Sequence, residues 1–537
     1  MRTLATLAMV AFLAACTSLP PGAEHPKQHS TALAQPESTW LGKELTAQAN
    51  RHPGLSGFHL LQHGPAGLML RTQLIAAAER TIDIQYFIFA KDHTGKLLQQ
   101  SILAAADRGV RVRMLVDDTN SFGERSSRDT LTALSDHRNI ELRLFNPFHY
   151  RGDVPALRLA DTALNAPRVN RRMHNKLFVV DNAMAIVGGR NVADEYYGVG
   201  TSQTGVLGIP LGEAPIRFGD FDVAAVGPIV PRLSESFDVY WNSALSVPSE
   251  ALTPVAPSAP SLSQARADLS TGSLDPTAKP RATPGNPLAG LLANRMGFVL
   301  AKAEVVVDPP DKADAQTGES AGSPIAAALV DAISDARRDL VIVTPYFVPG
   351  QRVEAMLKDA LRGNVRVRIL TNSLASTDVP RAFAGYRKYR KPLFESGAEL
   401  YETRAVPGEK PGGSGISGSG SDAPFALHAK LYVYDLRRVF IGSPNFDRRS
   451  FNLNTELALM IESPELARQI VERFNRFAAS DNSYRLTLDS SGPLGPRLRW
   501  QTERDGVAIE QNDDPDATPW KRAQIELYSL LPIDELL

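Results

Sequence analysis

Two short stretches of the sequence repeat one pattern, in which a single residue separates a histidine from a lysine. His174 and Lys176 form the first copy, and His428 and Lys430 form the second. On a β-strand, residues i and i+2 project from the same face, so each pair would reach one pocket together. Two imidazoles and two ammonium groups suit displacement at phosphorus: one imidazole attacks, the other protonates the leaving oxygen, and the lysines stabilise charge on the phosphate oxygens. We therefore predict that the chain transfers phosphodiester groups.

Each copy continues with the same spacing of an aspartate and an asparagine. The aspartates, Asp181 and Asp435, stand five positions after the lysines, and the asparagines, Asn191 and Asn445, stand ten positions later. The asparagine amides can donate hydrogen bonds to a phosphate without adding charge. Because a pattern of this length recurs inside a larger repeat, coincidence is remote, and we predict that both copies contribute to one active site.

Two further carboxylates are candidates for holding the histidines. An imidazole that attacks phosphorus needs its far nitrogen bound, usually by a carboxylate or a carbonyl. Asp220 and Glu456 occupy matching places, each on an alternating strand and seven positions before a Gly-Pro or Ser-Pro dipeptide. We predict that they orient the histidines; the alternative is that both are exposed strand carboxylates.

The elements that must position these residues also occur twice and in the same order. In each half, a helical stretch is followed by an aliphatic strand, a second helix, a strand of alternating arginine and valine, and a strand with the histidine. The matched segments are 74–89 and 329–348, 97–107 and 353–361, 109–117 and 364–371, and 174–180 and 428–434. This order predicts an α/β fold of two domains related by internal duplication, with mixed or parallel sheets flanked by helices and one active site at their interface.

Changes in composition suggest where these domains begin and end. We predict a signal peptide over residues 1–16, a tether over 17–54, a first domain over 55–247, a linker rich in proline, serine and alanine over 248–297, a second domain over 298–485 and a C-terminal extension over 486–537. The Gly/Ser-rich residues 407–424 are either a flap at the mouth of the site or a plain surface insertion. Residues 520–537 are either an interfacial segment or a helix that packs on the body.

The N-terminus has the pattern of a secretory signal. A cation at Arg2 precedes an apolar stretch that is too short to span a bilayer, and small residues lead into Cys16, the only cysteine. Residues 13–16 (LAAC) resemble the bacterial lipoprotein box, in which the cysteine is acylated; the alternative is an ordinary signal peptide that contains a cysteine. We predict a lipoprotein of the bacterial cell envelope that is anchored to a membrane and faces the periplasm.

Composition narrows the partners and cofactors. The 537 residues carry a formal net charge of -1, so no general positive field exists to hold duplex nucleic acid. One cysteine cannot form a cysteine-based metal cage, and no other run of Asp, Glu, His and Cys has the spacing of metal ligands. We expect no catalytic metal, no cofactor and no nucleic-acid partner.

Together these motifs resemble the phospholipase D superfamily, whose mark is a duplicated His-x-Lys-x4-Asp motif. Segments outside the motif are similar to the bacterial cardiolipin synthase C branch, and the similarity runs from about residue 55 to the C-terminus. The similar segments are 143–148, 170–176, 188–191, 370–374, 446–450 and 454–456. The resemblance implies two phospholipase D-like domains and a metal-independent reaction in two steps, through a phosphohistidine.

The same resemblance implies a role for each motif residue. His174 would be the nucleophile, and His428 would protonate the leaving group and later deprotonate the incoming alcohol. Asp181 and Asp435 belong to the motif, but they would brace the ends of their strands and not touch phosphorus.

The substrates follow from the resemblance and not from the motif itself. It implies a phosphatidyltransferase that makes cardiolipin from phosphatidylglycerol and a second phospholipid, with phosphatidylethanolamine as a candidate. Its partners would be membrane phospholipids and the bacterial membrane. Three alternatives stay open: a phospholipase D that hydrolyses phospholipids to phosphatidic acid, a secreted nuclease, and a lipid-binding scaffold without activity. Intact His-x-Lys pairs argue against a scaffold, and the lack of basic character argues against a nuclease.

Overall fold

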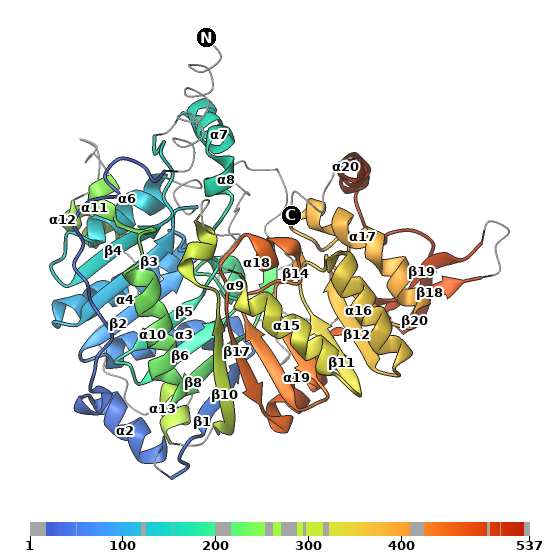
Figure 1. Ribbon diagram of the computed structural model, residues 1–537, viewed down its shortest axis with the longest axis horizontal. Helices are drawn as coiled ribbons and strands as arrows, with labels where there is room; N and C mark the ends of the chain where they lie inside the picture. Colours follow the sequence, from blue (N-terminus) through green and yellow to red (C-terminus); the bar gives the residue numbers. More distant parts are fainter. Residues whose placement is uncertain are drawn as a thin grey trace.

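The protein is described here from a computed structural model. The structure describes residues 18–49, 51–119, 125–152, 154–198, 216–252, 261–269, 287–293, 297–314, 322–408, 424–490, 495–504 and 506–530. Cys16 and residues 409–423 of the Gly/Ser-rich segment lie outside these ranges. Figure 1 shows two lobes side by side, with the first half of the chain in blue to green and the second half in yellow to red.

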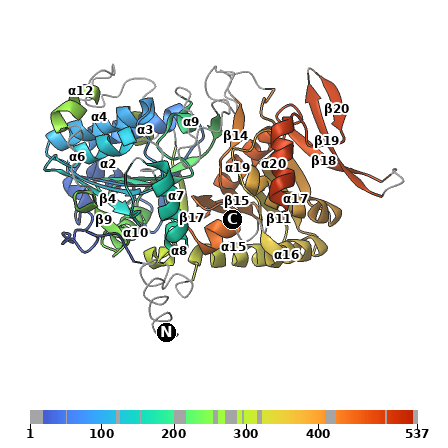
Figure 2. The same ribbon diagram turned by 90° about the horizontal axis from the view of Figure 1, so that it is seen from above.

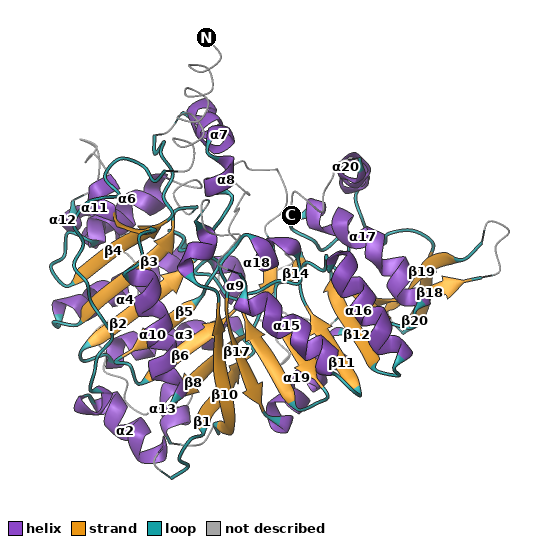
Figure 3. Ribbon diagram, viewed as in Figure 1, coloured by secondary structure: helices purple, strands orange, loops and turns teal. Residues whose placement is uncertain are grey.

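In the described part of the chain, one mixed sheet of 18 strands runs through both halves of the molecule (Figure 3). Its strands, in spatial order along the sheet, are β9 (Ser246–Pro248), β4 (Ile140–Phe145), β3 (Arg111–Asp117), β2 (Thr81–Tyr86), β5 (Leu177–Val180), β6 (Met184–Gly188), β8 (Asp222–Val226), β1 (Ser56–Leu61), β10 (Val299–Val307), β17 (Leu457–Glu462), β16 (Arg438–Gly442), β15 (Leu431–Tyr434), β11 (Asp339–Val343), β12 (Arg366–Asn372), β13 (Glu399–Thr403), β18 (Ser483–Asp489), β19 (Arg497–Arg504) and β20 (Val507–Gln511).

The sheet is symmetric about its middle, where β1 and β10 pair antiparallel with Gly57 opposite Leu300. Moving outward from this junction, the same eight strands follow in the same order on each side, and only β2-β3-β4 and β11-β12-β13 are parallel. The predicted α/β fold with internal duplication is therefore confirmed. The two sheets are joined edge to edge, where residues 56–58 of β1 pair with residues 299–301 of β10.

Helices cover both faces of the sheet and enclose three large hydrophobic cores. One core belongs to each half, and the third contains residues of both, among them Trp241 and Phe474. The helices are α2 (Trp40–Ala49), α3 (Gly64–Ala77), α4 (His93–Asp107), α6 (Arg125–Leu134), α7 (Pro155–Leu164), α8 (Ala166–Val169), α9 (Asp194–Tyr197), α10 (Ile229–Trp241), α11 (Ser249–Leu252), α12 (Leu262–Leu269), α13 (Pro287–Leu292), α15 (Pro324–Asp335), α16 (Gly350–Arg362), α17 (Pro380–Glu395), α18 (Arg448–Asn452), α19 (Pro464–Phe477) and α20 (Pro519–Ser529), with 3-10 helices η1 (Pro36–Ser38) and η3 (Pro310–Ala313).

Asp181 and Asp435 each hold a helix-to-strand turn at the outer end of a histidine strand. The Asp181 carboxylate accepts hydrogen bonds from the backbone N–H groups of residues 79, 80 and 81, at 2.8 to 3.0 Å. Asp435 accepts from the backbone N–H groups of residues 337, 338 and 339. Both aspartates have positive φ, 52° and 53°, a conformation that aspartate tolerates better than most residues. Each one therefore fixes the start of a parallel strand.

The segments outside the duplicated core contain secondary structure of their own. Within residues 248–297, the described parts form α11, α12 and α13, and Leu269 and Leu288 are buried in the core of the first half. In the C-terminal extension, β19 and β20 lengthen the sheet, and Ile525 of α20 is buried in the core of the second half. Among the described residues, no helix has the length and apolar character needed to cross a bilayer.

Candidate active site

Each histidine segment is bound at the carboxyl end of a parallel strand of its own half. In the first half, Asp117 at the end of β3 accepts a hydrogen bond from the backbone N–H of Met173, at 2.8 Å. In the second half, Asn372 at the end of β12 exchanges hydrogen bonds with the backbone of Leu427, at 2.8 and 2.9 Å. Each histidine therefore lies beside the carboxyl end of a parallel strand of its own half, where an active site is commonly found.

Each histidine segment then pairs with a strand of the other half. β14 (Phe425–Leu427) runs parallel to β7 (Arg217–Gly219), and the backbone N–H of His428 donates to Gly219 at 2.8 Å. In the other copy, Met173 forms a parallel bridge with Thr455, and the backbone N–H of His174 donates to Thr455 at 2.9 Å. Gly219 precedes Asp220 and Thr455 precedes Glu456, so these ladders bring each histidine beside a carboxylate from the opposite half.

The first pair is His174 with Glu456. The Nδ1 atom of His174 lies 3.0 and 2.9 Å from the two carboxylate oxygens of Glu456. The hydroxyl groups of Ser443 and Ser450 also donate to this carboxylate. A carboxylate can only accept, so Nδ1 carries the hydrogen and the lone pair is left on Nε2. The arrangement leaves Nε2 as the nucleophilic atom.

The second pair is His428 with Asp220, and it includes a lysine. Nδ1 of His428 lies 2.6 Å from Asp220 Oδ2, and Asp220 Oδ1 accepts from the backbone N–H of Phe221 at 2.7 Å. Nζ of Lys430 lies 2.8 and 3.1 Å from the two ring nitrogens of His428. Both lysines donate to the backbone carbonyl of the histidine two residues earlier, but among the described residues Lys176 Nζ, which lies 2.7 Å from the carbonyl oxygen of His174, makes no hydrogen bond to the His174 ring. The two halves of the site are therefore not equivalent.

Aromatic rings enclose both imidazoles. The ring of Phe87 meets His174 edge-on at 5.1 Å between centroids, and Lys176 Nζ lies 5.5 Å from the same ring. Tyr196 and Phe218 both lie 5.0 Å from the His428 ring. The aromatic pair at the end of the first strand is visible in the sequence, but the contacts of Tyr196 and Phe218 depend on the pairing between the halves. The sequence interpretation missed both residues.

The two asparagines of the motif differ in their contacts. Asn191 donates to the hydroxyl of Tyr196 at 2.8 Å and accepts from the backbone N–H of Ile88 at 3.3 Å, so it supports the aromatic wall. The buried Oδ1 of Asn445 has no hydrogen-bond partner among the described residues. Asp181 and Asp435 are not brought to the histidines, because each holds a backbone turn at the far end of its strand.

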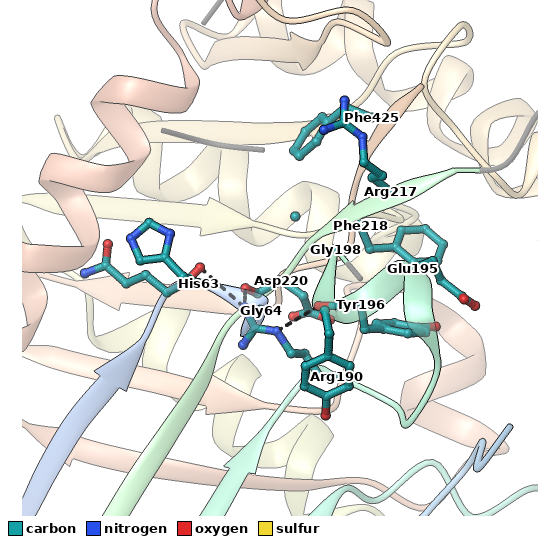
Figure 4. A pocket seen from close by; sticks show the side chains of 13 residues that line it. His63, Gly64, Arg190, Glu195, Tyr196, Gly198, Arg217, Phe218, Asp220 and Phe425 are labelled. Carbon is teal, nitrogen blue, oxygen red and sulfur yellow. Dashed lines mark hydrogen bonds between the residues drawn. The ribbon is translucent and has the colours of Figure 1, made fainter. Parts of the chain in front are cut away.

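A small hollow of about 30 Å³, lined by Asp220 and Phe218, adjoins the His428 side of the site (Figure 4). Two cations, Arg190 and Arg217, also line it. The Arg190 guanidinium is buried and bound by backbone carbonyls, including those of Leu61 and Tyr196. Arg190 therefore holds the wall of this hollow in place, and the hollow has room for about one water molecule.

Both histidines of the site lie within segments that match one protein family. The family described as "Cardiolipin synthase, PLD-like domain" matches residues 72–199 and 329–478, and each match contains one His-x-Lys motif. The chain belongs to this family. The predicted resemblance to the phospholipase D superfamily and its cardiolipin synthase branch is thereby confirmed.

Individual relatives cover nearly the whole chain. Cardiolipin synthase C of Escherichia coli (strain K12) is 35% identical over 501 residues, which are 93% of this chain and 99% of that protein. Cardiolipin synthase A of Pseudomonas putida (strain GB-1) is 27% identical over 453 residues, 81% of this chain and 74% of that protein. A solved phosphatidylserine synthase of Haemophilus influenzae Rd KW20 superposes with a TM-score of 0.55 at 14% identity, over 92% of this chain and 99% of that one, and this likeness shows the fold alone.

Burial sets the protonation states of the first pair in this phospholipase D-like site. Burial lowers the pKa of His174 to about 4, with Glu456 opposing the shift and Lys176 adding to it. Burial by itself would raise the pKa of Glu456, but His174 and Lys176 outweigh it and lower that pKa to about 2. At neutral pH, His174 is therefore an uncharged imidazole that donates Nδ1–H to an ionised carboxylate, which is the state that a nucleophile needs.

The second pair keeps its proton on the lysine. Burial, together with the charges of Lys430 and Lys176, lowers the pKa of His428 well below its ordinary value. Burial lowers the pKa of Lys430 to about 8, with Asp220 opposing the shift. At pH 7 the proton therefore resides on Lys430, within hydrogen-bond distance of the His428 ring. Such interacting groups titrate together, so His428 can pass this proton to a leaving oxygen while Lys430 supplies it.

These pKa values predict how activity depends on pH. Burial lowers the pKa of Lys176 to about 7, so this ammonium group loses its proton, and with it a charge that binds phosphate, as the pH rises through about 7. We expect kcat/KM for phosphodiester turnover to be level from about pH 5 to about 7 and to fall above that. Replacement Lys176→Arg keeps the charge, so the fall should begin about one pH unit higher, where Lys430 titrates.

The control for this measurement is Lys302→Arg, which changes an exposed lysine of β10. It should leave the pH profile as it is in the unmodified protein. If kcat/KM of Lys176→Arg falls at the same pH as in the unmodified protein, deprotonation of Lys176 is not the cause of the fall.

Proposed function

We propose that the protein is a phosphatidyltransferase that makes cardiolipin from phosphatidylglycerol and a second phospholipid through a phosphohistidine. The observation that carries this proposal is the unequal pair of histidines at one site: a neutral His174 held by Glu456, and a His428 in contact with a proton-bearing Lys430. The relationship to the two cardiolipin synthases gives the substrate class.

In the first step, Nε2 of His174 attacks the phosphorus of a phospholipid. A P–N bond forms as the P–O bond to the head-group alcohol breaks. His428 protonates the departing oxygen with the proton that Lys430 supplies, so the alcohol leaves neutral. Lys176 stabilises the charge on the non-bridging oxygens. The product is a phosphatidyl group on His174.

In the second step, a hydroxyl group of phosphatidylglycerol attacks the same phosphorus. His428 accepts the hydroxyl proton and returns it to Lys430, a new P–O bond forms, and the P–N bond to His174 breaks. Water in place of this hydroxyl gives phosphatidic acid, the product of a phospholipase D. The acceptor therefore decides between synthesis and hydrolysis, and the groups around the histidines serve both.

We assign the nucleophile to His174 because of its surroundings. Glu456 is held by His174 and two serine hydroxyls, which fixes the imidazole in one tautomer. Lys430 contacts the ring of His428 and can supply the proton that a general acid must donate to the leaving group. No comparable contact from Lys176 to the His174 ring occurs in the part of the chain that the structure describes.

Acylation of Cys16 is part of the same proposal. A lipid on this cysteine, at the end of an exported leader, would hold the enzyme at a membrane on the periplasmic side of the bacterial envelope. Phosphatidylglycerol, with phosphatidylethanolamine as the candidate second lipid, would then lie in the plane of the membrane beside the enzyme.

The direct test is the product formed by the purified full-length protein. Vesicles of isotope-labelled phosphatidylglycerol, with and without phosphatidylethanolamine, are incubated with it and the lipids are resolved by mass. We expect labelled cardiolipin, and no turnover with His174→Ala. Phosphatidic acid as the sole product would instead identify a hydrolase.

The assignment of the nucleophile predicts which histidine carries the intermediate. A phosphatidyl ester of p-nitrophenol has a leaving group that needs no protonation, so the first step can proceed without the acid. We expect His428→Asn to accumulate a phosphatidyl group on His174, detected by intact mass and peptide mapping. The matched variant His174→Asn should accumulate none. An adduct on His428 in that variant would reverse the two roles.

A further inference from the structure

The helical projection formed by α7 and α8 has its polar side inward and its apolar side outward. Its exposed positions recur with helical spacing, and all but one of them are apolar. They are Val154, Ala156, Leu157, Leu159, Ala160, Ala163, Leu164, Ala166, Pro167 and Asn170. The side chain of Leu159 is 72% exposed and that of Leu164 is 55% exposed. A surface helix of a water-soluble domain normally has the opposite orientation.

The inward side of this projection is fixed by polar contacts. Asp161 is buried, where it accepts from the backbone N–H of Tyr150 at 3.0 Å and from Asn165 at 2.6 Å. Arg168 is also buried and donates to Asn146 and to the backbone of Pro147. These contacts fix the orientation of α7 and α8. A rotation of α7 about its axis that buried its leucines against the body would break them.

A second apolar stripe lies on the same side of the molecule. On α20, Trp520, Ala523, Leu527 and Leu530 are exposed with spacings of three and four residues, while Ile525 faces the core. Lys521 fastens this helix to the loop after β12 through the backbone oxygens of residues 375 and 377. Figure 1 shows α7 and α20 at the upper edge of the molecule, and both face the viewer in Figure 2, which looks down on that edge.

The projection of α7 and α8 is close to the active site along the chain. α7 follows the carboxyl end of β4, and α8 ends five residues before His174. An arginine lies beside the projection: Arg449 donates to the side chain and backbone of Asn170 at the end of α8. Arg172 lies over the ring of Phe148, but it is buried and ion-paired with Asp117. The exposed leucines therefore lie outermost, and a guanidinium group lies beneath them. In a membrane surface, the acyl chains and the phosphates are arranged in the matching order.

We propose that the exposed faces of α7–α8 and α20 insert into the surface of a phospholipid bilayer and turn this edge of the molecule toward it. The inference rests on the proposed function, because a lipid substrate must reach His174 from the membrane. We favour a bilayer over a protein as the partner of these faces. The apolar stripes of α7–α8 and α20 lie on two separate helices at one edge of the molecule, and Arg449 lies beside the first of them.

Local insertion is measured with an environment-sensitive fluorophore on a single cysteine. The full chain carries Cys16→Ser, which removes the only native thiol, and either Leu159→Cys or Val239→Cys. Val239 is a matched control, since it is 57% exposed but lies on α10, away from the upper edge in Figure 1. With vesicles of phosphatidylglycerol and phosphatidylethanolamine that contain a nitroxide-labelled lipid, the Leu159 label should shift to the blue and be quenched.

The Val239 label should change in neither way. Equal quenching at both positions, or none at Leu159, would overturn the proposal. Loss of a dimer in Leu159→Glu, without any quenching in the labelled protein, would instead identify the face as a contact between copies.

A second measurement separates this proposal from the proposed function. Turnover of phosphatidylglycerol is compared in vesicles and as a dissolved short-chain monomer, for Leu159→Glu and for Val239→Glu. Replacing a membrane-buried leucine by a charge should lower the ratio of vesicle to monomer turnover by at least about ten-fold, whereas Val239→Glu should keep it. An unchanged ratio contradicts docking. If the unmodified protein turns over neither form, the proposed function fails, and the quenching result still decides the docking proposal.

Discussion

The active site depends on two short ladders that cross from one half of the chain to the other. In each, the segment before a histidine pairs in parallel with the segment before the carboxylate of the opposite half. Without this exchange, His174 and His428 would have no carboxylate, and Asp220 and Glu456 would be buried charges without imidazoles. A buried charge without a partner destabilises the fold, because it has lost its hydration without gaining a compensating interaction. The interface between the halves is therefore fixed by the same contacts that orient the histidines.

The continuous sheet makes these short ladders possible. The pairing of β1 with β10 joins the sheets of the two halves, and the crossed ladders bring together the histidine segments that are bound at the carboxyl ends of β3 and β12. Small differences in the copies then separate the roles of the histidines. Ser443 donates to Glu456, whereas a side chain at the matching Gly189 would lie 2.3 Å from Asp220 Oδ1. In the first half, the carboxylate of Asp220 thus occupies the space that the Ser443 hydroxyl occupies beside Glu456 in the second half.

Low polarity around the four basic groups explains their proton distribution. Burial disfavours each positive charge, so the imidazoles stay neutral and the two ammonium groups hold their protons only weakly. A bound phosphodiester would bring a compensating negative charge to a site already arranged to receive it. In this sense the site is prepared for a transition state with charge on the phosphate oxygens.

Much of this organisation could be predicted from the sequence, because the repeat makes local patterns appear twice. The duplicated α/β fold and its family follow from the two His-x-Lys motifs and the strands around them. Asp220 and Glu456 could be singled out by their matching positions. Which histidine each of them contacts could not, since that depends on pairing between residues more than 200 positions apart.

The outward leucines of α7 escaped prediction for a different reason. Periodicity shows that a helix has an apolar side, but it does not show which side faces the body. In α7 a buried network around Asp161 and Arg168 decides the orientation.

The most direct test of the crossed pairs is nitrogen NMR of the histidine rings. In protein labelled with ¹⁵N-histidine, the signals of His174 and His428 are assigned by their loss in His174→Gln and His428→Gln. We predict that Glu456→Gln shifts the ring signals of His174 and leaves those of His428 nearly unchanged, and that Asp220→Asn does the reverse. A shift of His428 in Glu456→Gln together with an unaffected His174 would contradict the exchange of carboxylates between the halves.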